Sequence, residues 1–370
     1  MAGIYIHVPF CKSKCNYCTF CRTTDGSSAE AYLEALTREF VLCQCCEQIE
    51  TVYIGGGTPS SIGVTLLRRL LSAVREHFDL SSVVEYTVEC NPEDMTYELA
   101  KMLVDMGVNR VSMGVQSLDD NMLKMMNRRH NAARVSQAVE TLRNNGITNI
   151  SIDFIYGLPQ HKGYDYANDI EKFIAMNVPH LSAYALSYEE GSHFYNMLQK
   201  GLLSPTADDD VSEQYSLLTH KLNEAGYEHY EISNYARKGF HSRHNTSYWH
   251  RIPYYGFGPA ACSLSGNSRR SNTYDIAHYI RALRDNLEYF DTETLSADDI
   301  YNEQVMLNLR TSAGLNIADI AAMGDKYKRH FLENVSPFIG DGSGFVRNNL
   351  YMINEDKWFI SDYITSRLFV

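Results

Sequence analysis

The chain has 370 residues, of which 44% are hydrophobic and 21% are charged, and its formal net charge is −12. These values are typical of a globular protein with one large and one smaller domain, and they argue against nucleic-acid binding, because phosphate contacts need a basic surface. No apolar run is long enough to span a bilayer, and we expect no signal peptide. Nine cysteines without a secretory signal favour metal or redox chemistry in a reducing compartment, so we expect a cytoplasmic protein.

Short β-branched runs alternate with amphipathic segments through the first half of the chain, and this alternation predicts a parallel sheet with helical crossovers. Six such repeats form an α/β fold, a partial (β/α)6 TIM-like barrel whose active site lies at the C-terminal ends of the strands. The predicted strands are Gly3–Val8, Thr51–Ile54, Glu85–Glu89, Arg110–Gly114, Ile150–Ile155 and His180–Ala185. The predicted helices are Glu30–Glu47, Thr65–His77, Thr96–Met106, Asn131–Asn145 and Tyr164–Met176.

The pattern changes after Ala185. The sequence predicts helices at Asp208–Ala225, Ile276–Leu287 and Ser296–Arg310, ordered loop at Gly239–Gly266, and a hairpin with a short helix at Gly344–Phe369. Helices followed by a hairpin indicate a small α+β, winged-helix-like domain at the C-terminus. We therefore divide the chain into a barrel at residues 1–235, a connecting loop segment at 236–270 and a C-terminal domain at 271–370.

Three cysteines, Cys11, Cys15 and Cys18, follow the first predicted strand with three and then two residues between them. Three thiols in one loop can hold a four-iron, four-sulfur cluster, and such a cluster keeps one iron without a protein ligand, where a substrate can bind. A zinc site that adds Cys21 as the fourth ligand is the alternative, although structural zinc prefers paired Cys-x2–4-Cys knuckles.

A run of three glycines, Gly55-Gly56-Gly57, ends the second predicted strand and continues into Thr58-Pro59. Residues without a Cβ let the backbone approach a ligand closely and expose its amides and carbonyls. Taken alone the run indicates a tight turn. Beside a three-cysteine loop it becomes a candidate site for the ammonium group of a ligand.

Further polar residues fall where other strands end. Glu89 ends the third strand, Gln116 follows the fourth and Asp153 lies near the end of the fifth. Because the C-terminal ends of parallel strands meet at one edge of a barrel, we expect these side chains to share a site with the cysteine loop.

These motifs together resemble the radical S-adenosylmethionine (SAM) enzymes, and within them the coproporphyrinogen III dehydrogenase-like branch. The likeness covers roughly the first 265 residues and rests on Ile4–Cys18, Gly55–Pro59, Glu89–Pro92, Arg110–Ser117, Asp153–Pro159 and His180–Tyr184. The resemblance implies that the open iron binds the amino and carboxylate groups of SAM. An electron donor then reduces the cluster, and the sulfonium bond is cleaved to a 5′-deoxyadenosyl radical.

The resemblance also implies roles for single residues. Those that match positions around a first SAM are Tyr5, Gly56 and Glu89. Those that match positions around a second SAM in the decarboxylating members are Tyr17, Gly57, Thr58, Gln116, Arg128 and Asp153. The chemistry fits, because a carboxylate can accept both ribose hydroxyls and an arginine can bind a carboxylate with two donors. Each residue alone is more often a surface ion pair or a backbone cap.

Two departures resemble the heme chaperone branch of this family. Phe20 stands where a decarboxylase has a fourth cysteine, and the chain starts almost directly at the first strand. In addition, Arg243–Trp249 resembles that branch's His-Asn-x-x-Tyr-Trp motif, whose histidine, here His244, is implicated in heme binding. Imidazole is a good axial ligand for heme iron, but a structural histidine packed among aromatics explains the pattern as well. His241 and His250 stay open as alternatives.

Three other features bear on the site. Cys262 stands where relatives commonly have histidine, and either a second heme ligand or a buried thiol explains it. Gln160 and His161 follow Pro159 with one residue fewer than usual, which bears on second-SAM binding. Ordinary thiols in a helical segment are predicted at Cys43, Cys45 and Cys46.

The sequence therefore predicts a heme chaperone of radical SAM type that binds a [4Fe-4S] cluster, SAM and heme. Heme would pass to a hemoprotein or to a membrane-associated respiratory-chain protein, and an electron donor is a further implied partner. The alternatives are oxygen-independent coproporphyrinogen III dehydrogenase and another radical transformation of a tetrapyrrole. The number of SAM molecules and the oligomeric state stay open.

Overall fold

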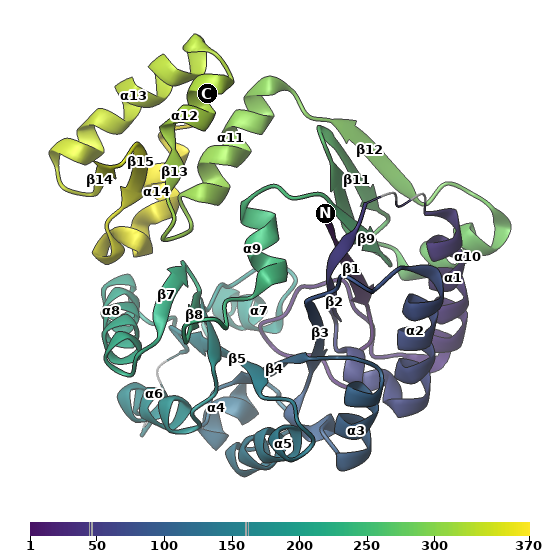
Figure 1. Ribbon diagram of the computed structural model, residues 1–370. Helices are drawn as coiled ribbons and strands as arrows, with labels where there is room; N and C mark the ends of the chain where they lie inside the picture. Colours follow the sequence, from purple (N-terminus) through teal and green to yellow (C-terminus); the bar gives the residue numbers. More distant parts are fainter. Residues whose placement is uncertain (44, 46, 160, 162) are drawn as a thin grey trace.

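The structure is a computed structural model that describes residues 1–43, 45, 47–159, 161 and 163–370. Within these residues a twelve-stranded sheet has the order β12-β11-β10-β9-β1-β2-β3-β4-β5-β6-β8-β7, and a three-stranded sheet has the order β13-β15-β14. Figure 1 shows the large sheet curving around the centre of the molecule, with helices along its outer side. The small sheet lies with the C-terminal helices in a separate lobe.

The six predicted strands are confirmed, and they pair in parallel in chain order as a partial barrel. Their bounds are β1 (Ala2–Val8), β2 (Ile49–Gly56), β3 (Glu85–Cys90), β4 (Arg110–Gln116), β5 (Asn149–Tyr156) and β6 (His180–Ala185). The helices of this part are α1 (Ala29–Leu42), α2 (Gly63–His77), α3 (Tyr97–Asp105), α4 (Asp120–Met125), α5 (Ala132–Asn144), α6 (Tyr166–Ala175), α7 (His193–Gln199) and α8 (Asp208–Glu224). Short 3-10 turns are η1 (Gly26–Ser28), η2 (Pro59–Ile62) and η3 (Pro92–Asp94).

The barrel strands alternate between two faces, as a period of two requires. Ile4, Ile6, Val52 and Ile54 are fully buried in the core that includes side chains from the outer helices. The opposite face of the strands is polar and carries Tyr5, Tyr53, Glu89, Ser112 and Asp153, several of which bond to one another. The apolar face holds the helices in place, and the polar face lines the inside of the barrel.

Further strands extend the barrel sheet at both of its edges. On one side β6 pairs with β8 (Asn234–Ala236), which pairs with β7 (Glu228–Glu231). On the other side β1 pairs in parallel with β9 (Tyr254–Phe257), and the sheet continues through β10 (Cys262–Ser265), β11 (Ser268–Asn272) and β12 (Phe290–Thr294). Residues 254–294 thus extend the large sheet beyond β1. The division of the chain at residues 235 and 270 stays a prediction.

The loop predicted at 239–266 is wrong, because the structure has α9 (Arg243–Trp249), β9 and β10 in this segment. Ser242 caps α9 by accepting a hydrogen bond from the Asn245 N–H (3.3 Å). These elements are four to seven residues long, too short for a helical or strand period to stand out in the sequence. The predicted helix at 30–47 is also too long, because α1 ends at Leu42 and the chain must turn to enter β2 at Ile49.

The C-terminal part confirms the predicted hairpin followed by a helix. Its elements are α10 (Ile276–Asp285), α11 (Ala297–Asn308), β13 (Leu315–Asn316), α12 (Ile317–Ala322), α13 (Asp325–Gly340), β14 (Gly344–Arg347), β15 (Leu350–Ile353), η4 (Glu355–Ile360) and α14 (Ser361–Ser366). Backbone bonds from Ile232 to Arg310 (2.9 Å) and from Ser312 to Tyr230 (3.1 Å) join this lobe to the barrel.

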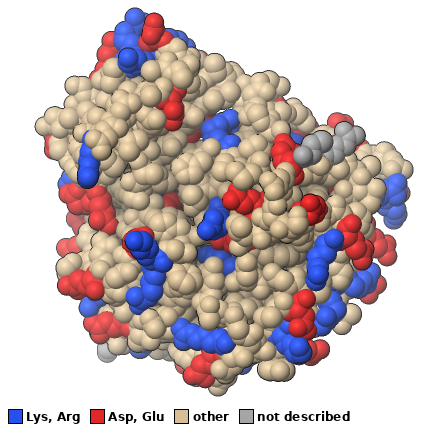
Figure 2. All heavy atoms as spheres, in the orientation of Figure 1, with Lys and Arg blue, Asp and Glu red and all other residues tan. Residues whose placement is uncertain are grey.

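The surface carries charges of both signs. Figure 2 shows Lys and Arg side chains interspersed with Asp and Glu over the visible face, without a broad basic area. No helix in the described part of the chain has the length and apolar character needed to cross a bilayer.

A buried carboxylate joins α1 to the extension of the sheet. Glu39 is 1% exposed and accepts hydrogen bonds from Tyr279 Oη (2.6 Å), Asn272 Nδ2 (2.8 Å), Arg270 Nη2 (2.7 Å) and the Gly258 N–H (2.8 Å). Burial raises its pKa, and these four donors offset part of that shift. One side chain therefore connects α1 with α10, β11 and the turn after β9.

Glu39→Ala should lower the free energy of unfolding by roughly 3 kcal/mol, because it leaves buried donors without an acceptor. Glu34→Ala on the exposed face of the same helix is the matched control and should change the free energy by less than about 0.5 kcal/mol. Urea denaturation followed by circular dichroism measures both. Equal effects of the two variants would contradict this role for Glu39.

Candidate functional site

The three cysteines lie in the loop between β1 and α1, and backbone hydrogen bonds fix the shape of this loop. The Cys11 N–H donates to the Thr23 carbonyl (2.9 Å), and the Thr23 N–H donates to the Pro9 carbonyl (2.7 Å). Between the cysteines, the Asn16 side chain donates to the Met125 carbonyl (2.7 Å) at the end of α4. The loop is therefore held by the barrel and by the segment after β4.

Each of the three thiols contacts a polar partner. Cys11 Sγ lies 3.5 Å from Thr58 Oγ1, Cys15 Sγ accepts from Arg128 Nη1 (3.3 Å), and Cys18 Sγ accepts from Arg22 Nε (3.2 Å). The thiolate is the form of cysteine that binds iron. Burial raises the pKa of Cys11 to about 11, and its hydrogen bond to Thr58 offsets part of the increase. Iron binding would therefore have to displace the proton from this thiol.

Cys21 does not share this arrangement. Its side chain is 4% exposed, and its thiol donates to the Tyr274 carbonyl (3.2 Å) instead. Among the described residues, no three His, Cys, Asp or Glu side chains are grouped closely enough to hold a single metal ion. Three thiols that have two guanidinium neighbours fit a larger, anionic iron–sulfur cluster better than a zinc ion with Cys21 as its fourth ligand.

The glycine turn after β2 packs directly on the backbone of the cysteine loop. A Cβ on Gly57 would lie 2.8 Å from the Phe10 carbonyl oxygen and 3.0 Å from the Phe10 nitrogen. The Thr58 N–H donates to the same carbonyl (2.8 Å), so the two loops are bonded at their closest point. Gly56 has a φ of +111°, in the left-handed region, and its N–H donates to Glu89 Oε2 (3.1 Å).

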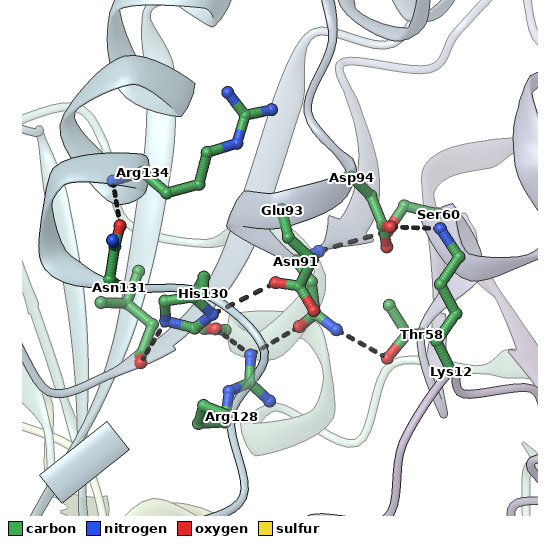
Figure 3. A network of polar contacts seen from close by, with 12 residues as sticks. Lys12, Thr58, Ser60, Asn91, Glu93, Asp94, Arg128, His130, Asn131 and Arg134 are labelled. Carbon is green, nitrogen blue, oxygen red and sulfur yellow. Dashed lines mark hydrogen bonds and ion pairs between the residues drawn. The ribbon is translucent and has the colours of Figure 1, made fainter. Parts of the chain in front are cut away.

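A network of polar contacts runs beneath the cysteine loop (Figure 3). Asn91 Nδ2 donates to Thr58 Oγ1 (3.4 Å), and Asn91 Oδ1 accepts from Arg128 Nη2 (2.7 Å). Since Thr58 contacts Cys11 and Arg128 contacts Cys15, Asn91 links the two cysteines through their neighbours. Neither Asn91 nor Arg22 was predicted as a site residue, although Asn91 belongs to the Glu89–Pro92 motif.

Two partly buried carboxylates lie on the inner face of the strands. Glu89 Oε1 accepts from Tyr53 Oη (2.7 Å), and Asp153 Oδ1 accepts from Ser112 Oγ (3.3 Å). Burial raises the pKa of Glu89 to about 7 and the pKa of Asp153 to about 6. The negative charge of Asp153 adds to the increase at Glu89. A cation beside either carboxylate would therefore lower its pKa.

The remaining predicted SAM residues surround the same end of the barrel. Tyr5 Oη bonds to His7 Nδ1 (3.0 Å), and Tyr17 faces Arg128 and Cys15. Gln116 has a φ of 76°. It lies at the end of β4, where the register between β4 and β5 shifts. The structure thus places the cysteines, the glycine turn, the carboxylates and Arg128 at one end of the barrel.

His244 lies toward the N-terminal end of β2, and Tyr53 contacts both His244 and Glu89. The His244 Nδ1 bonds to Thr51 Oγ1 (2.8 Å) near the start of β2, and its Nε2 bonds to Tyr248 Oη (2.9 Å). The ring stacks on Tyr53 with 5.2 Å between centroids and is 1% exposed. Burial, and secondarily the charge of Arg110, lowers the pKa of His244 to about 3, so the imidazole is neutral.

Two of the other described cysteines, Cys262 and Cys43, have surroundings of their own. Cys262 Sγ lies 3.5 Å from Ser271 Oγ on the neighbouring strand of the sheet extension. Cys43 follows the last residue of α1 in an extended conformation, so the helical placement predicted for it is wrong. The predictions for Cys46 and Gln160 lie outside the described residues.

Residues 5–172 match the family model described as the radical SAM superfamily. The chain is 38% identical over 312 residues to a heme chaperone HemW of Lactococcus lactis, covering 84% of this chain and 82% of that protein. It is 34% identical over 335 residues to the protein of the same name from Bacillus subtilis, covering 89% and 88%. The chain belongs to the HemW family of radical SAM proteins.

A solved structure shares the fold of this HemW family member. It is the coproporphyrinogen III oxidase (HemN) from Escherichia coli, a radical SAM enzyme, with a TM-score of 0.87 and 21% identity. The match covers 100% of this chain and 90% of that one, so it confirms the α/β barrel with its C-terminal lobe. Radical SAM membership also confirms that a [4Fe-4S] cluster and SAM are the cofactors of the family.

Gly57→Ala should reduce the iron bound after anaerobic reconstitution to less than about half, because the new methyl group forces the cysteine loop away from β2. Gly26→Ala is the matched control, since a methyl group at that position would meet no heavy atom within 4 Å and the φ of Gly26 is not positive. Iron analysis and absorption at visible wavelengths measure the result. Normal iron content in Gly57→Ala would show that the close approach is dispensable.

Proposed function

We propose that this protein is a heme chaperone that binds heme on a radical SAM scaffold and passes it to a recipient hemoprotein. The observation that carries the proposal is the 38% identity to a heme chaperone HemW over 84% of the chain. The geometry supports it, because the cysteine loop, the glycine turn and the two carboxylates form one continuous site at the barrel end.

Within this proposal, Cys11, Cys15 and Cys18 hold the [4Fe-4S] cluster. The cluster, when bound, supplies a single electron and an iron that accepts the amino acid end of SAM. Arg22 and Arg128 balance the negative charge of the thiolates from two sides.

The SAM site would be built from the inner face of the strands. The Gly56 N–H donates to the Glu89 carboxylate, so these two residues would line the site together. Tyr5 lies on the neighbouring strand β1. Gly57, Thr58, Tyr17, Gln116, Arg128 and Asp153 are the residues proposed for a second SAM. Glu89 and Asp153 attract the positive groups of the nucleotide, and Thr58, bonded to the Phe10 carbonyl through its N–H, holds the cysteine loop against this site.

Phe20 argues against the alternative reaction, the oxidative decarboxylation of coproporphyrinogen III. Its side chain is 70% exposed and lines a small pocket together with Cys18 and Arg22. A decarboxylase of this family carries a cysteine at this point, and no sulfur is available from Phe20. The similarity to HemN shows the fold alone.

Heme ligation by His244 stays a prediction, and it requires a movement of α9. The imidazole is neutral, which is the form that binds iron, but both ring nitrogens are engaged by Thr51 and Tyr248. The start of α9 is also bonded to Glu85, whose carboxylate accepts from the Arg243 N–H (2.9 Å) and the His244 N–H (3.0 Å). Iron could reach His244 only after α9 moves away from β2 and β3.

The proposal includes a cytoplasmic location, an electron donor for the cluster and a recipient hemoprotein or respiratory-chain protein. A reducing compartment is supported by the cysteines, since no disulfide joins those that the structure describes. The boundaries of the barrel, connecting segment and C-terminal domain at residues 235 and 270 belong to the same proposal.

The reconstituted protein should bind heme tightly and transfer it to an apo-hemoprotein, while coproporphyrinogen III incubated with SAM and a reductant stays unchanged. Difference absorption spectroscopy follows heme binding and transfer, and product analysis by chromatography follows the porphyrinogen. The serine variant of Cys11, Cys15 and Cys18 controls for the role of the cluster. Clean formation of protoporphyrinogen IX would overturn the chaperone proposal in favour of the dehydrogenase.

If His244 ligates heme, His244→Ala should weaken heme uptake by about tenfold or more while the visible absorption of the cluster persists. Thr51→Val separates ligation from packing, because it removes one hydrogen bond of the imidazole and keeps the ring. Thr51→Val should therefore bind heme at least as well as wild type, and His220→Ala serves as an exposed histidine control. Equal losses in His244→Ala and Thr51→Val would assign His244 to the core.

A further inference from the structure

A buried arginine in the barrel has donors without direct partners. Arg110 is 1% exposed at the start of β4, and its Nε and Nη1 atoms are buried without a hydrogen-bond partner. No carboxylate among the described residues lies within ion-pair distance of its guanidinium group. A permanent charge in this position is costly unless negative charge lies nearby. The surroundings of Arg110 should therefore explain why the position holds a cation.

The strand register places two carboxylates above Arg110 on the same face. β3 and β4 pair Thr87 with Arg110 and Glu89 with Ser112, and β4 and β5 pair Gly114 with Asp153. Ser112 lies two residues beyond Arg110, about 7 Å along the strand, and its hydroxyl donates to Asp153 (3.3 Å). Glu89 therefore pairs with the residue two positions beyond Arg110, and Asp153 pairs with the residue four positions beyond it.

The charge of Arg110 acts on both carboxylates. Burial raises the pKa of Glu89 to about 7 and that of Asp153 to about 6, and the positive charge of Arg110 holds both values lower than burial alone would give. Arg128 adds to this effect at Asp153. The proposed SAM site thus has two carboxylates that ionise near neutral pH, with a cation fixed beneath them.

We propose that Arg110 is a positioning residue that keeps Glu89 and Asp153 charged, so that they can bind the positive groups of SAM. This inference rests on the SAM site proposed above. Arg110 itself lies too deep in the barrel to be one of the residues proposed to contact the nucleotide.

Six phenols and imidazoles that face this region stay neutral near pH 7. Burial raises the pKa values of Tyr5, Tyr53, Tyr184 and Tyr230, so these phenols stay neutral. Burial lowers the pKa values of His180 and His244, so these imidazoles stay neutral as well. Glu85 also faces this region, and its carboxylate is bonded to the first N–H groups of α9. The six neutral groups therefore add no change of charge in the pH range where Glu89 and Asp153 titrate.

The test compares Arg110→Gln, which removes the charge, with Arg110→Lys, which keeps it. Calorimetric titration of SAM into anaerobically reconstituted protein is carried out between pH 6 and pH 9. If the pKa of Glu89 rises by one unit, Arg110→Gln should bind SAM about fivefold more weakly at pH 7, and it should approach wild-type affinity at pH 9. Arg110→Lys should follow the wild-type profile. A uniform loss at every pH would overturn the proposal, because a purely structural role has no such pH dependence.

A second measurement needs no SAM. Since the folded-state pKa values of Glu89 and Asp153 exceed their ordinary values, their contribution to stability is present at low pH and is lost as pH rises through about 6 to 7. Arg110→Gln enlarges this loss, so its melting temperature relative to that of wild type should fall progressively between pH 5 and pH 8. A difference that does not grow with pH would contradict the role assigned to Arg110.

Two outcomes separate this inference from the proposed function. Wild-type protein that binds no SAM would overturn the SAM site, whereas the melting curves still test the link between Arg110 and the carboxylates.

If Arg110→Gln alone does not fold, adding Glu89→Gln removes the charge left unbalanced and should restore folding. A double variant that is no more stable than Arg110→Gln would refute the charge coupling.

Discussion

The close approach of Gly57 to the backbone at Phe10 is the contact on which the site depends. It brings the turn after β2 against the loop after β1, so the thiol of Cys11 and the hydroxyl of Thr58 face each other at 3.5 Å. Any side chain at Gly57 would separate the two loops. Asn91 and Arg128 then tie this pair to Cys15, and the whole end of the barrel becomes one bonded unit.

The barrel carries different chemistry at its two ends. The C-terminal ends of the strands hold the cysteine loop, Glu89 and Asp153, whereas His244 and Glu85 lie toward their N-terminal ends, where α9 enters the inside of the sheet. The polar inner face that joins these ends includes Arg110. A ligand held near His244 and a nucleotide held near the cysteines would therefore occupy separate places on one scaffold.

Much of the barrel was predictable because its outer face must be apolar. The outward-facing residues Ile4, Ile6, Val8, Val52 and Ile54 are β-branched and fully buried, so the pattern in the sequence reflects packing against helices. The cysteines were also predictable, because all three lie in one loop and their spacing can be read directly from the sequence. By contrast, the seven residues of α9 are held by a carboxylate from β3, a contact that no local pattern records.

Single residues of the site were harder to predict for a related reason. Arg22, Asn91 and Arg110 act through partners that are distant in the sequence or through charge alone, and none of them has a distinctive spacing. His244 shows the opposite case, because its motif is evident while its surroundings are those of a packed core residue. A motif identifies a residue type at a position, and the neighbours decide whether its atoms are accessible.

The bonding of the cysteine loop has a consequence for the assembly of its metal centre. The loop is tied to the end of α4 through Asn16, and its Lys14 carbonyl accepts from the Asn127 side chain (2.7 Å). The Asn16 carbonyl also accepts from the Phe194 N–H (2.8 Å) at the start of α7. Much of the entropy of ordering this segment is thus lost when the apoprotein folds, before iron arrives. Insertion of the cluster would then require mainly rotation of thiol side chains, and the iron-free chain should already resist cleavage by proteases at this loop.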